Sequence, residues 1–298
     1  MTERIRIIEN GRAGTRRLRR RLERVRQTLS QEGKRVEYLC PKDANETLSL
    51  VATATREVCD LLVISGGDGT LNLAAQSFLK LARATRPPLA VIPSGRGNDF
   101  AHEMGVHTLE RATRAILSGR ERAIDVGRSD GCFFLGIAGT GFDSLAARRA
   151  QSIPLLSGRA LYIYAALRTL SVYEPFRVRL VGDGQELFSG PITLVAAANT
   201  RRYGGGMFIA PEARLDDGKL DVCIAEAMPV ATLIRLFPRL FRATRVTHAA
   251  VKYFRVARLE IEDLGTERVE LFADGEFMQT LPATISVLEK ELVVRGIY

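Results

Sequence analysis

The chain has 298 residues, 46% of them apolar, with a formal charge of +9 and a pI of about 9.7. This length fits two modest domains better than one, and the positive charge favours anionic partners such as phosphates, acidic lipids or nucleic acid. The charged start and the lack of a run of about 18 apolar residues exclude a signal peptide and a membrane-spanning helix.

The 4 cysteines form no C-x-x-C pair and the 3 histidines show no metal-ligand spacing. We therefore expect reduced, mostly buried thiols in a cytoplasmic protein without zinc.

The first part of the chain alternates strands and helices. Strands are expected at 4–10, 35–40, 60–67 and 88–95, and helices at 16–32, 45–57, 71–84, 99–104 and 108–118. Such alternation is typical of a parallel sheet with helices on both faces, which binds ligands at the carboxyl ends of its strands.

The character of the sequence changes near Arg122. Strands are expected within 122–141, 176–200, 219–227, 252–263 and 268–280, with helical interruptions at 144–173 and 231–241. Asp-Gly pairs in these segments are typical of tight hairpin turns. The fold class is therefore α/β plus β: an N-terminal Rossmann-like α/β domain and a C-terminal antiparallel β-sandwich.

The stretch SGGDGTLN, at 65–72, follows the apolar third strand. Its glycines, Gly66, Gly67 and Gly69, let a ligand approach the main chain, and Thr70 is expected to cap the next helix. A helix N-terminus favours phosphate, and Asp68 beside phosphate needs a bridging cation such as Mg²⁺. The alternative is an ordinary strand–helix turn rich in small residues.

Two further loops follow the fourth and first strands. PSGRGNDFAHEMG, at 93–105, offers Asn98 as a helix cap and Asp99 in the first helical turn. NGRAG, at 10–14, again fits a backbone cradle for an anion. Behind it, seven arginines lie between 16 and 26; these are best interpreted as a solvated helix face, because aromatic residues that would favour RNA are missing.

The motifs NGRAG, GGDGTLN, PSGRGNDFA, GGGMFIAPEARLDDGKLDV and ADGE occur here in the order and spacing of the diacylglycerol kinase catalytic superfamily. The chain resembles the soluble bacterial lipid kinases of that superfamily, which are similar to sphingosine and ceramide kinases. The resemblance implies an ATP-binding α/β domain at 1–122, to which 286–298 return, and a β-sandwich lipid-substrate domain at 123–285. ATP would lie on the first domain and the lipid against the second.

The resemblance also implies roles for single residues. Asp68 and Asp99 would organise the phosphates and Mg²⁺. The nucleotide site would include Asn10, Gly11, Arg12, Ala13, Gly14, Cys40, Gly66, Gly67, Asp68, Gly69, Thr70, Leu71, Asn72, Arg96 and Asn98. A second, structural metal would use the side chain of Asp217 and the carbonyls of Arg214 and Lys219, although the residues alone would equally make a hairpin turn.

The pair of acids in ADGE, Asp274 and Glu276, has two interpretations. From the residues alone, Asp274 is a turn residue. The resemblance implies that Asp274 or Glu276 deprotonates the acceptor hydroxyl.

Two departures from the family pattern concern the nucleotide site: Arg96 stands where the family often has a small hydroxyl residue, and Gly11 stands where it has a proline.

The segment 231–259 carries seven basic residues and no acid, with leucine and phenylalanine among the first of them. It is expected either to lie on an anionic membrane surface or to pack its apolar face on the sandwich, with Pro238 interrupting the helix.

These observations predict an ATP- and Mg²⁺-dependent lipid kinase that contacts the inner face of the membrane peripherally and could form a homodimer. An NAD kinase shares GGDGT, but GNDFA argues against it. The third alternative is a catalytically silent binder of nucleotide or nucleic acid.

Overall fold

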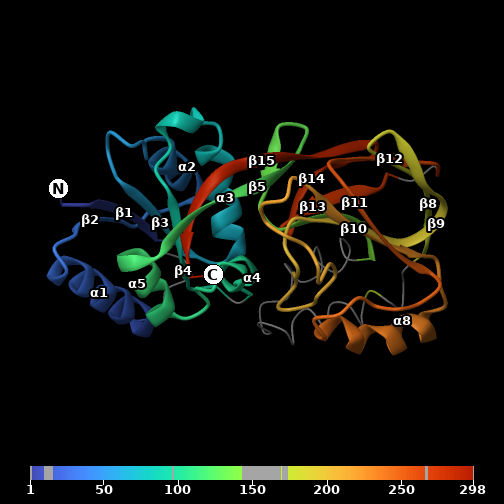
Figure 1. Ribbon diagram of the computed structural model, residues 1–298, viewed down its shortest axis with the longest axis horizontal. Coiled ribbons are helices and arrows are strands. Elements are labelled where there is room, and N and C mark those ends of the chain that lie inside the picture. Colours follow the sequence, from blue (N-terminus) through green and yellow to red (C-terminus); the bar gives the residue numbers. More distant parts are fainter. Residues whose placement is uncertain are drawn as a thin grey trace. The chain divides into compact units, whose positions relative to one another are not determined.

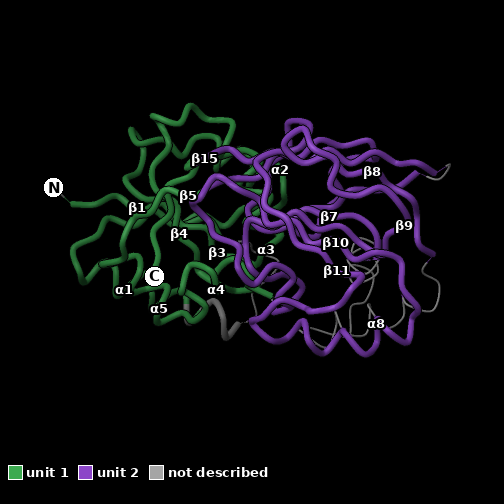
Figure 2. Tube along the Cα trace, turned by 45° about the vertical axis from the view of Figure 1, so that its right-hand side comes forward, with its two compact units in different colours: residues 1–124, 290–298 green, residues 125–289 purple. Residues whose placement is uncertain are grey.

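The structure is a computed structural model that describes residues 2–9, 16–95, 97–142, 169, 174–265 and 268–297. The chain divides into two compact units (Figure 2): unit 1 is Met1–Ile124 with Lys290–Tyr298, and unit 2 is Asp125–Glu289. The corresponding boundaries expected from the sequence are 122/123 and 285/286. Strands β5 (Arg120–Ser129) and β15 (Ala283–Gly296) each continue from one unit into the other.

Unit 1 is built on a parallel sheet with the strand order β2-β1-β3-β4, and the end of β15 pairs with β4. Its strands are β1 (Arg4–Glu9), β2 (Arg35–Leu39), β3 (Leu61–Gly66) and β4 (Leu89–Pro93). All six residues of β3 are buried, as the continuous apolar run of a central parallel strand predicts.

Helices cover this sheet on both faces. α1 (Arg16–Gln31) packs beside α5 (Leu109–Ser118), and α2 (Ala44–Ala52) packs beside α3 (Asp68–Phe78). Figure 1 shows these two pairs on opposite sides of the strands. The shorter helical segments are α4 (Asp99–Glu103) and η2 (Arg83–Thr85).

Three helix predictions need correction. α2 ends at Ala52 rather than 57, and α3 runs from Asp68 to Phe78 rather than over 71–84. The helix expected at 231–241 is α8 (Val230–Leu236) followed by the 3-10 turn η3 (Phe237–Phe241), with Pro238 near the start of the turn. The change at this point agrees with a proline that cannot donate a helical hydrogen bond. The helix expected at 144–173 lies outside the described residues, apart from residue 169.

Unit 2 is an antiparallel β structure. Its strands pair in the order β14-β13-β7-β9-β8-β12-β15, while β10 joins β9 to β11 and β6 pairs with β5. They are β6 (Cys132–Phe134), β7 (Ile137–Gly141), β8 (Phe176–Gly182), β9 (Gln185–Ala198), β10 (Leu220–Glu226), β11 (Val251–Val256), β12 (Arg258–Asp263), β13 (Glu270–Ala273) and β14 (Glu276–Thr280). A core of buried side chains from these strands fills the space between them.

The Asp-Gly turns are confirmed by their backbone angles. Asp130, Asp183 and Asp274 have φ of 44, 48 and 51°, and the following glycines have φ of 77, 82 and 86°. Two successive residues with positive φ make the turn that joins twisted antiparallel strands.

The expectation of mostly buried thiols is only half right. Cys59 and Cys223 are buried, whereas Cys132 is half-buried and Cys40 is exposed. In the part of the chain that the structure describes, no helix has the length and hydropathy needed to cross a membrane.

Candidate functional site

The loops after β3 and β4 meet at the carboxyl edge of the unit 1 sheet. The two strands are parallel neighbours in which Gly66 lies opposite Pro93, and the Ser94 N–H donates to the Gly66 carbonyl at 3.0 Å. The sequence predicts two glycine-rich, acid-bearing loops at neighbouring strand ends, and in unit 1 they lie against each other.

Two glycines of these loops are required by space. A Cβ on Gly95 would lie 2.3 Å from the Cα of Gly67, and a Cβ on Gly66 would lie 2.4 Å from the Cβ of Thr70. Because real Cβ atoms essentially never approach other atoms so closely, the contact between the loops requires glycine at 95, and the turn into α3 requires glycine at 66.

Asp68 links the two loops through its carboxylate. One oxygen accepts the N–H of Asp99 and the other accepts the N–H of Phe100, both at 3.2 Å. These are donors of the first turn of α4, so the acid of the first loop caps the helix that follows the second loop.

Of the two caps expected from the sequence, Thr70 is wrong, whereas Asn98 takes the cap position but does not cap through its side chain. α3 begins at Asp68, so Thr70 lies inside its first turn, and Gly67 takes the cap position without a side-chain bond. Asn98 stands at the cap position of α4, but with φ of 57° its side chain turns back to the N–H and carbonyl of Gly95, at 3.0 and 2.9 Å. Asn98 thus closes its own loop, and Asp68 supplies the cap.

Gly97 lies between the two acids of this site. A Cβ at this position would be 2.9 Å from Oδ2 of Asp68 and 3.7 Å from Oδ2 of Asp99. Two carboxylates beside a residue without a side chain suit Mg²⁺, which takes one or two carboxylates and completes its shell with phosphate and water. Among the described residues, no three or more His, Cys, Asp or Glu side chains are grouped so that they could hold a metal ion. A metal here would therefore depend on phosphate and water oxygens.

The other expected nucleotide-binding residues differ in their positions. Leu71 and Asn72 are 3% and 7% exposed, so their side chains belong to the interior of unit 1. Cys40 is exposed just after β2. Residues 10–14 and 96, which include the anion cradle and Arg96, lie outside the described residues.

Sequence reasoning missed Glu9 at the same edge of the sheet. This carboxylate ends β1, is only 4% exposed, lies opposite Ser65 of β3 and accepts a hydrogen bond from the Tyr38 hydroxyl. The signal was present, because Glu9 is a charged residue directly after the apolar end of a buried strand.

In unit 2, the carboxylate of Asp274 is fully engaged by backbone. Oδ2 accepts the N–H of Leu135 at 2.9 Å, and Oδ1 accepts those of Gly136 and Ile137, each at 3.0 Å. Gly136 must be glycine, because its Cβ would lie 2.5 Å from Oδ1 of Asp274. These contacts identify Asp274 as the anchor of the β13–β14 hairpin to the start of β7.

Glu276 differs from Asp274 in its surroundings. It begins the edge strand β14 and is exposed as a residue, yet partial burial of its carboxyl raises its pKa above the ordinary value. Phe277, next along the strand, is 54% exposed. Of the two acids in ADGE, Glu276 is the one with a carboxylate suited to accept a proton.

The segment expected to hold a second metal contains an ion pair. One oxygen of Asp217 accepts the Lys219 N–H at 3.1 Å, and the other pairs with the Arg255 guanidinium. A metal on Asp217, Arg214 and Lys219 would compete with Arg255 for the Asp217 carboxylate, and this site stays a prediction.

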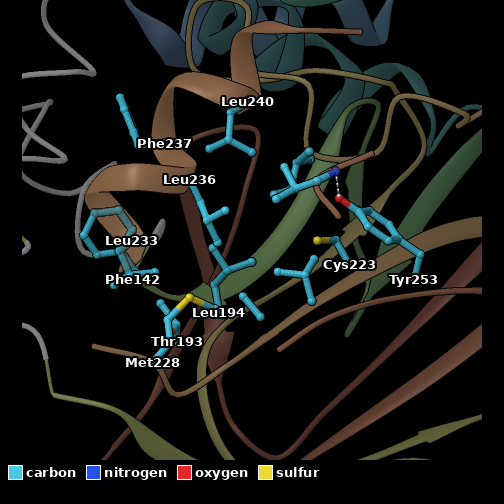
Figure 3. Close-up of a pocket in the computed structure, with 14 residues that line it drawn as sticks. Phe142, Thr193, Leu194, Cys223, Met228, Leu233, Leu236, Phe237, Leu240 and Tyr253 are labelled. Carbon is cyan, nitrogen blue, oxygen red and sulfur yellow. Dashed lines mark hydrogen bonds between the residues drawn. The ribbon is translucent and has the colours of Figure 1, made fainter. Parts of the chain in front are cut away.

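Unit 2 also contains an apolar cavity of about 80 Å³ between the helical segment α8–η3 and the sheet. Thr193 contributes a hydroxyl, which donates to the Glu226 carbonyl, and the Tyr253 hydroxyl accepts the Val246 N–H at 3.1 Å. Figure 3 shows the residues that line this cavity. The helical segment contributes Leu233, Leu236, Phe237 and Leu240, and the sheet contributes Leu194, Cys223 and Tyr253.

Comparison with known proteins finds two families, one for each part of the chain. Residues 4–129 match the diacylglycerol kinase catalytic domain, and residues 136–295 match the YegS C-terminal NAD kinase beta sandwich-like domain. The chain is 36% identical to a diacylglycerol kinase of Mycobacterium tuberculosis over 273 residues, covering 89% of this chain and 86% of that protein. It is 28% identical to a diacylglycerol kinase of Bacillus subtilis over 295 residues, covering 98% and 96%.

A solved Bacillus anthracis structure, titled as a diacylglycerol kinase, has the same fold. It superposes with a TM-score of 0.82 at 24% identity, covering 99% of this chain and 97% of that one. Fold and sequence together define a phosphotransferase class with an alcohol as acceptor. The chain belongs to the diacylglycerol kinase family, and its relatives include lipid kinases of the YegS type.

Proposed function

We propose that this protein transfers the γ-phosphoryl group of ATP, with Mg²⁺, to the hydroxyl of a diacylglycerol or a related lipid. The observation that carries the proposal is the Asp68 carboxylate, held by the first turn of α4 beside Asp99 and between glycines that leave the backbone bare. A loop of this kind at the carboxyl edge of a parallel sheet is suited to bind phosphates.

In the proposed mechanism, Asp68 and Asp99 would hold the metal. Mg²⁺ would offset the negative charge of the transferring phosphate. The bare backbone around Gly67, Gly95 and Gly97 admits the phosphates closely, and the hydrogen bonds that Asp68 accepts from α4 fix its carboxylate in one orientation. Fixed charges of this kind need no rearrangement during the reaction.

Glu276 would act as the base. As the lipid hydroxyl oxygen bonds to the γ-phosphorus and the bond to the β,γ-bridging oxygen breaks, the hydroxyl proton passes to the Glu276 carboxylate. A raised pKa favours this role, because a base works best when its pKa approaches the working pH. Asp274 would be a positioning residue, since its oxygens already accept three backbone N–H groups.

The apolar cavity under α8–η3 would take the end of an acyl chain. Its lining is almost entirely hydrocarbon, and the two polar groups described above are engaged by backbone. Burying methylene groups there is worth about 0.8 kcal/mol each, which favours a lipid over a small polar alcohol.

The outer side of the same segment would contact the membrane. Val230 and Ile234, one helical turn apart, are 42% and 50% exposed, and Arg235, Arg239 and Arg242 are exposed and form no described ion pair. Thus both expectations for this segment have support: apolar side chains pack inward, while exposed cations and two apolar residues suit an anionic bilayer.

Vesicle sedimentation tests this contact. We expect R235Q/R239Q/R242Q to lower binding to phosphatidylglycerol vesicles, with phosphatidylcholine vesicles as the neutral reference. The matched control, R20Q/R24Q/R26Q, removes the same charge from α1. Equal loss in both variants, or equal binding to both vesicle types, would contradict the docking proposal.

The activity itself is tested by transfer of labelled γ-phosphate to a panel of acceptors separated by chromatography. We expect label in a lipid such as diacylglycerol and none in NAD. Label in NAD alone would support the NAD kinase alternative, and nucleotide binding without any transfer would support a silent binder.

A further inference from the structure

Another cavity lies in unit 1, at the edge of the sheet opposite the loops that follow β3 and β4, which we call the phosphate loops. It has a volume of about 460 Å³ and is lined by Arg56, Arg83, Arg86 and Glu291, with Ala84, Pro87, Leu292 and Val293. Arg56 precedes β3, Arg86 precedes β4, and Glu291 precedes Val294, which pairs with Leu89 at the start of β4. The length of β4, roughly 15 Å at 3.3 Å per residue, separates this cavity from the candidate nucleotide site.

Arg86 is the unusual residue of this cavity. Its side chain is only 5% exposed, and Nη2 pairs with the Glu291 carboxylate. Its Nε and Nη1 are buried and have no hydrogen-bond partner. Because buried guanidinium groups normally have their N–H groups satisfied, two orphan donors beside a cavity indicate a missing acceptor.

The charge of the cavity points to an anion. Arg56 and Arg83 are exposed, and in the described part of unit 1 no carboxylate pairs with either of them. Three guanidinium groups therefore face a single carboxylate, that of Glu291. Guanidinium groups bind phosphate through parallel hydrogen bonds, which Arg86 could offer with its two free nitrogens.

We propose that this cavity binds a phosphate-bearing small molecule, at a site separate from the one that would hold ATP. Arg56 and Arg83 contact the phosphate from the open side. Arg86 lines the cavity, and its buried, unpartnered Nε and Nη1 reach the phosphate when the side chain turns away from Glu291. Glu291 competes with the ligand for Arg86, and Pro87 and Leu292 offer apolar surface to an organic substituent.

Calorimetric titration of the full chain tests this site, at constant ionic strength and without ATP turnover. The probes are inorganic phosphate and glycerol 3-phosphate. R56Q/R83Q should weaken binding of the probe roughly tenfold, because two charge-assisted contacts are lost. E291Q should strengthen binding several-fold, since it removes the competing carboxylate. R20Q/R24Q, the control of equal charge on α1, should bind like the wild type.

The outcomes separate the alternatives. Tighter binding of glycerol 3-phosphate than of phosphate would show that the apolar wall takes part, and equal binding would show recognition of phosphate alone; both support the site. Unchanged binding in R56Q/R83Q, weaker binding in E291Q, or a loss of the same size in the α1 control would overturn it. The phosphate loops are intact in every variant, so failure here leaves the proposed kinase activity untouched.

Discussion

Replacing Asp274 tests most sharply whether this acid has a structural or a catalytic role. The change Asp274→Ala leaves three backbone N–H groups of Leu135, Gly136 and Ile137 without their acceptor. A buried donor left unsatisfied costs about 1–3 kcal/mol. Because Asp274 is half-buried and water can replace part of the loss, we expect about 3–5 kcal/mol of lost unfolding free energy.

This loss is measurable by thermal unfolding. For a unit of this size, 1 kcal/mol shifts Tm by about 2–4 °C, so D274A should lower Tm by on the order of 10 °C. Asp274→Gly serves as the matched variant: it removes the same hydrogen bonds but relieves the cost of about 1 kcal/mol that alanine incurs at a φ of 51°. E276Q, at an exposed position, should change Tm by no more than about 1 °C while abolishing transfer.

The reverse pattern would refute this reasoning. If D274A kept the wild-type Tm and lost transfer, Asp274 would be the base and the three hydrogen bonds would be of little consequence. A folded E276Q variant with full transfer would remove Glu276 from the mechanism.

Three further outcomes follow from the same contacts. Gly95→Ala places a Cβ 2.3 Å from the Gly67 backbone, so it should separate the phosphate loops and reduce transfer at least about tenfold. The control is Gly265→Ala, whose Cβ would lie 3.2 Å from its nearest atom. Equal activity of the two variants would contradict the loop contact. Leu233→Trp fills the apolar cavity from α8 and should raise KM for a long-chain diacylglycerol about tenfold, with little change for a short-chain one; an equal change for both would exclude an acyl site there. The transfer rate should rise with pH as Glu276 loses its proton, because the base must be deprotonated to act. This rise should lie above pH 4.5, the pKa of an ordinary glutamate, because burial raises the pKa of Glu276. If the rise lies at the same pH in E276D and the wild type, or does not occur above pH 4.5, Glu276 is not the base.

Periodicity and glycine placement predict unit 1 well, because β3 and β4 are short apolar runs that glycine-rich loops follow. The error at the start of α3 has a local cause. Thr70 is a favourable cap residue, but Gly67 adopts the extended cap conformation, and Thr70 fills the space beside Gly66 instead. Which residue of this short stretch takes the cap position depends on this packing.

The roles of the acids depend on contacts between distant segments. Asp68 meets α4 about thirty residues along the chain, and Asp274 meets the start of β7 across 137 to 139 positions. The sequence assigned Asp68 and Asp274 to motifs of the family, but it left Asp274 and Glu276 as alternative candidates for the base. The structure shows a difference in their surroundings: three N–H groups engage Asp274, while Glu276 is exposed and has a raised pKa.

The buried Arg86 illustrates the same limit. Nothing in the stretch around it sets it apart from the other arginines, because its partner Glu291 lies 205 residues away. A partner at that distance becomes visible only when β15 returns to pair with β4.

The measurement that tests the central claim most directly is transfer of labelled γ-phosphate to diacylglycerol by wild type, Asp68→Asn and Glu276→Gln, each checked for folding by its Tm. We predict a labelled lipid with the wild type and none with either variant, although D68N should lose a little stability because the amide caps α4 less well than the carboxylate. Transfer near the wild-type level by a folded D68N would contradict the account, since the carboxylate that links the two phosphate loops would then be dispensable.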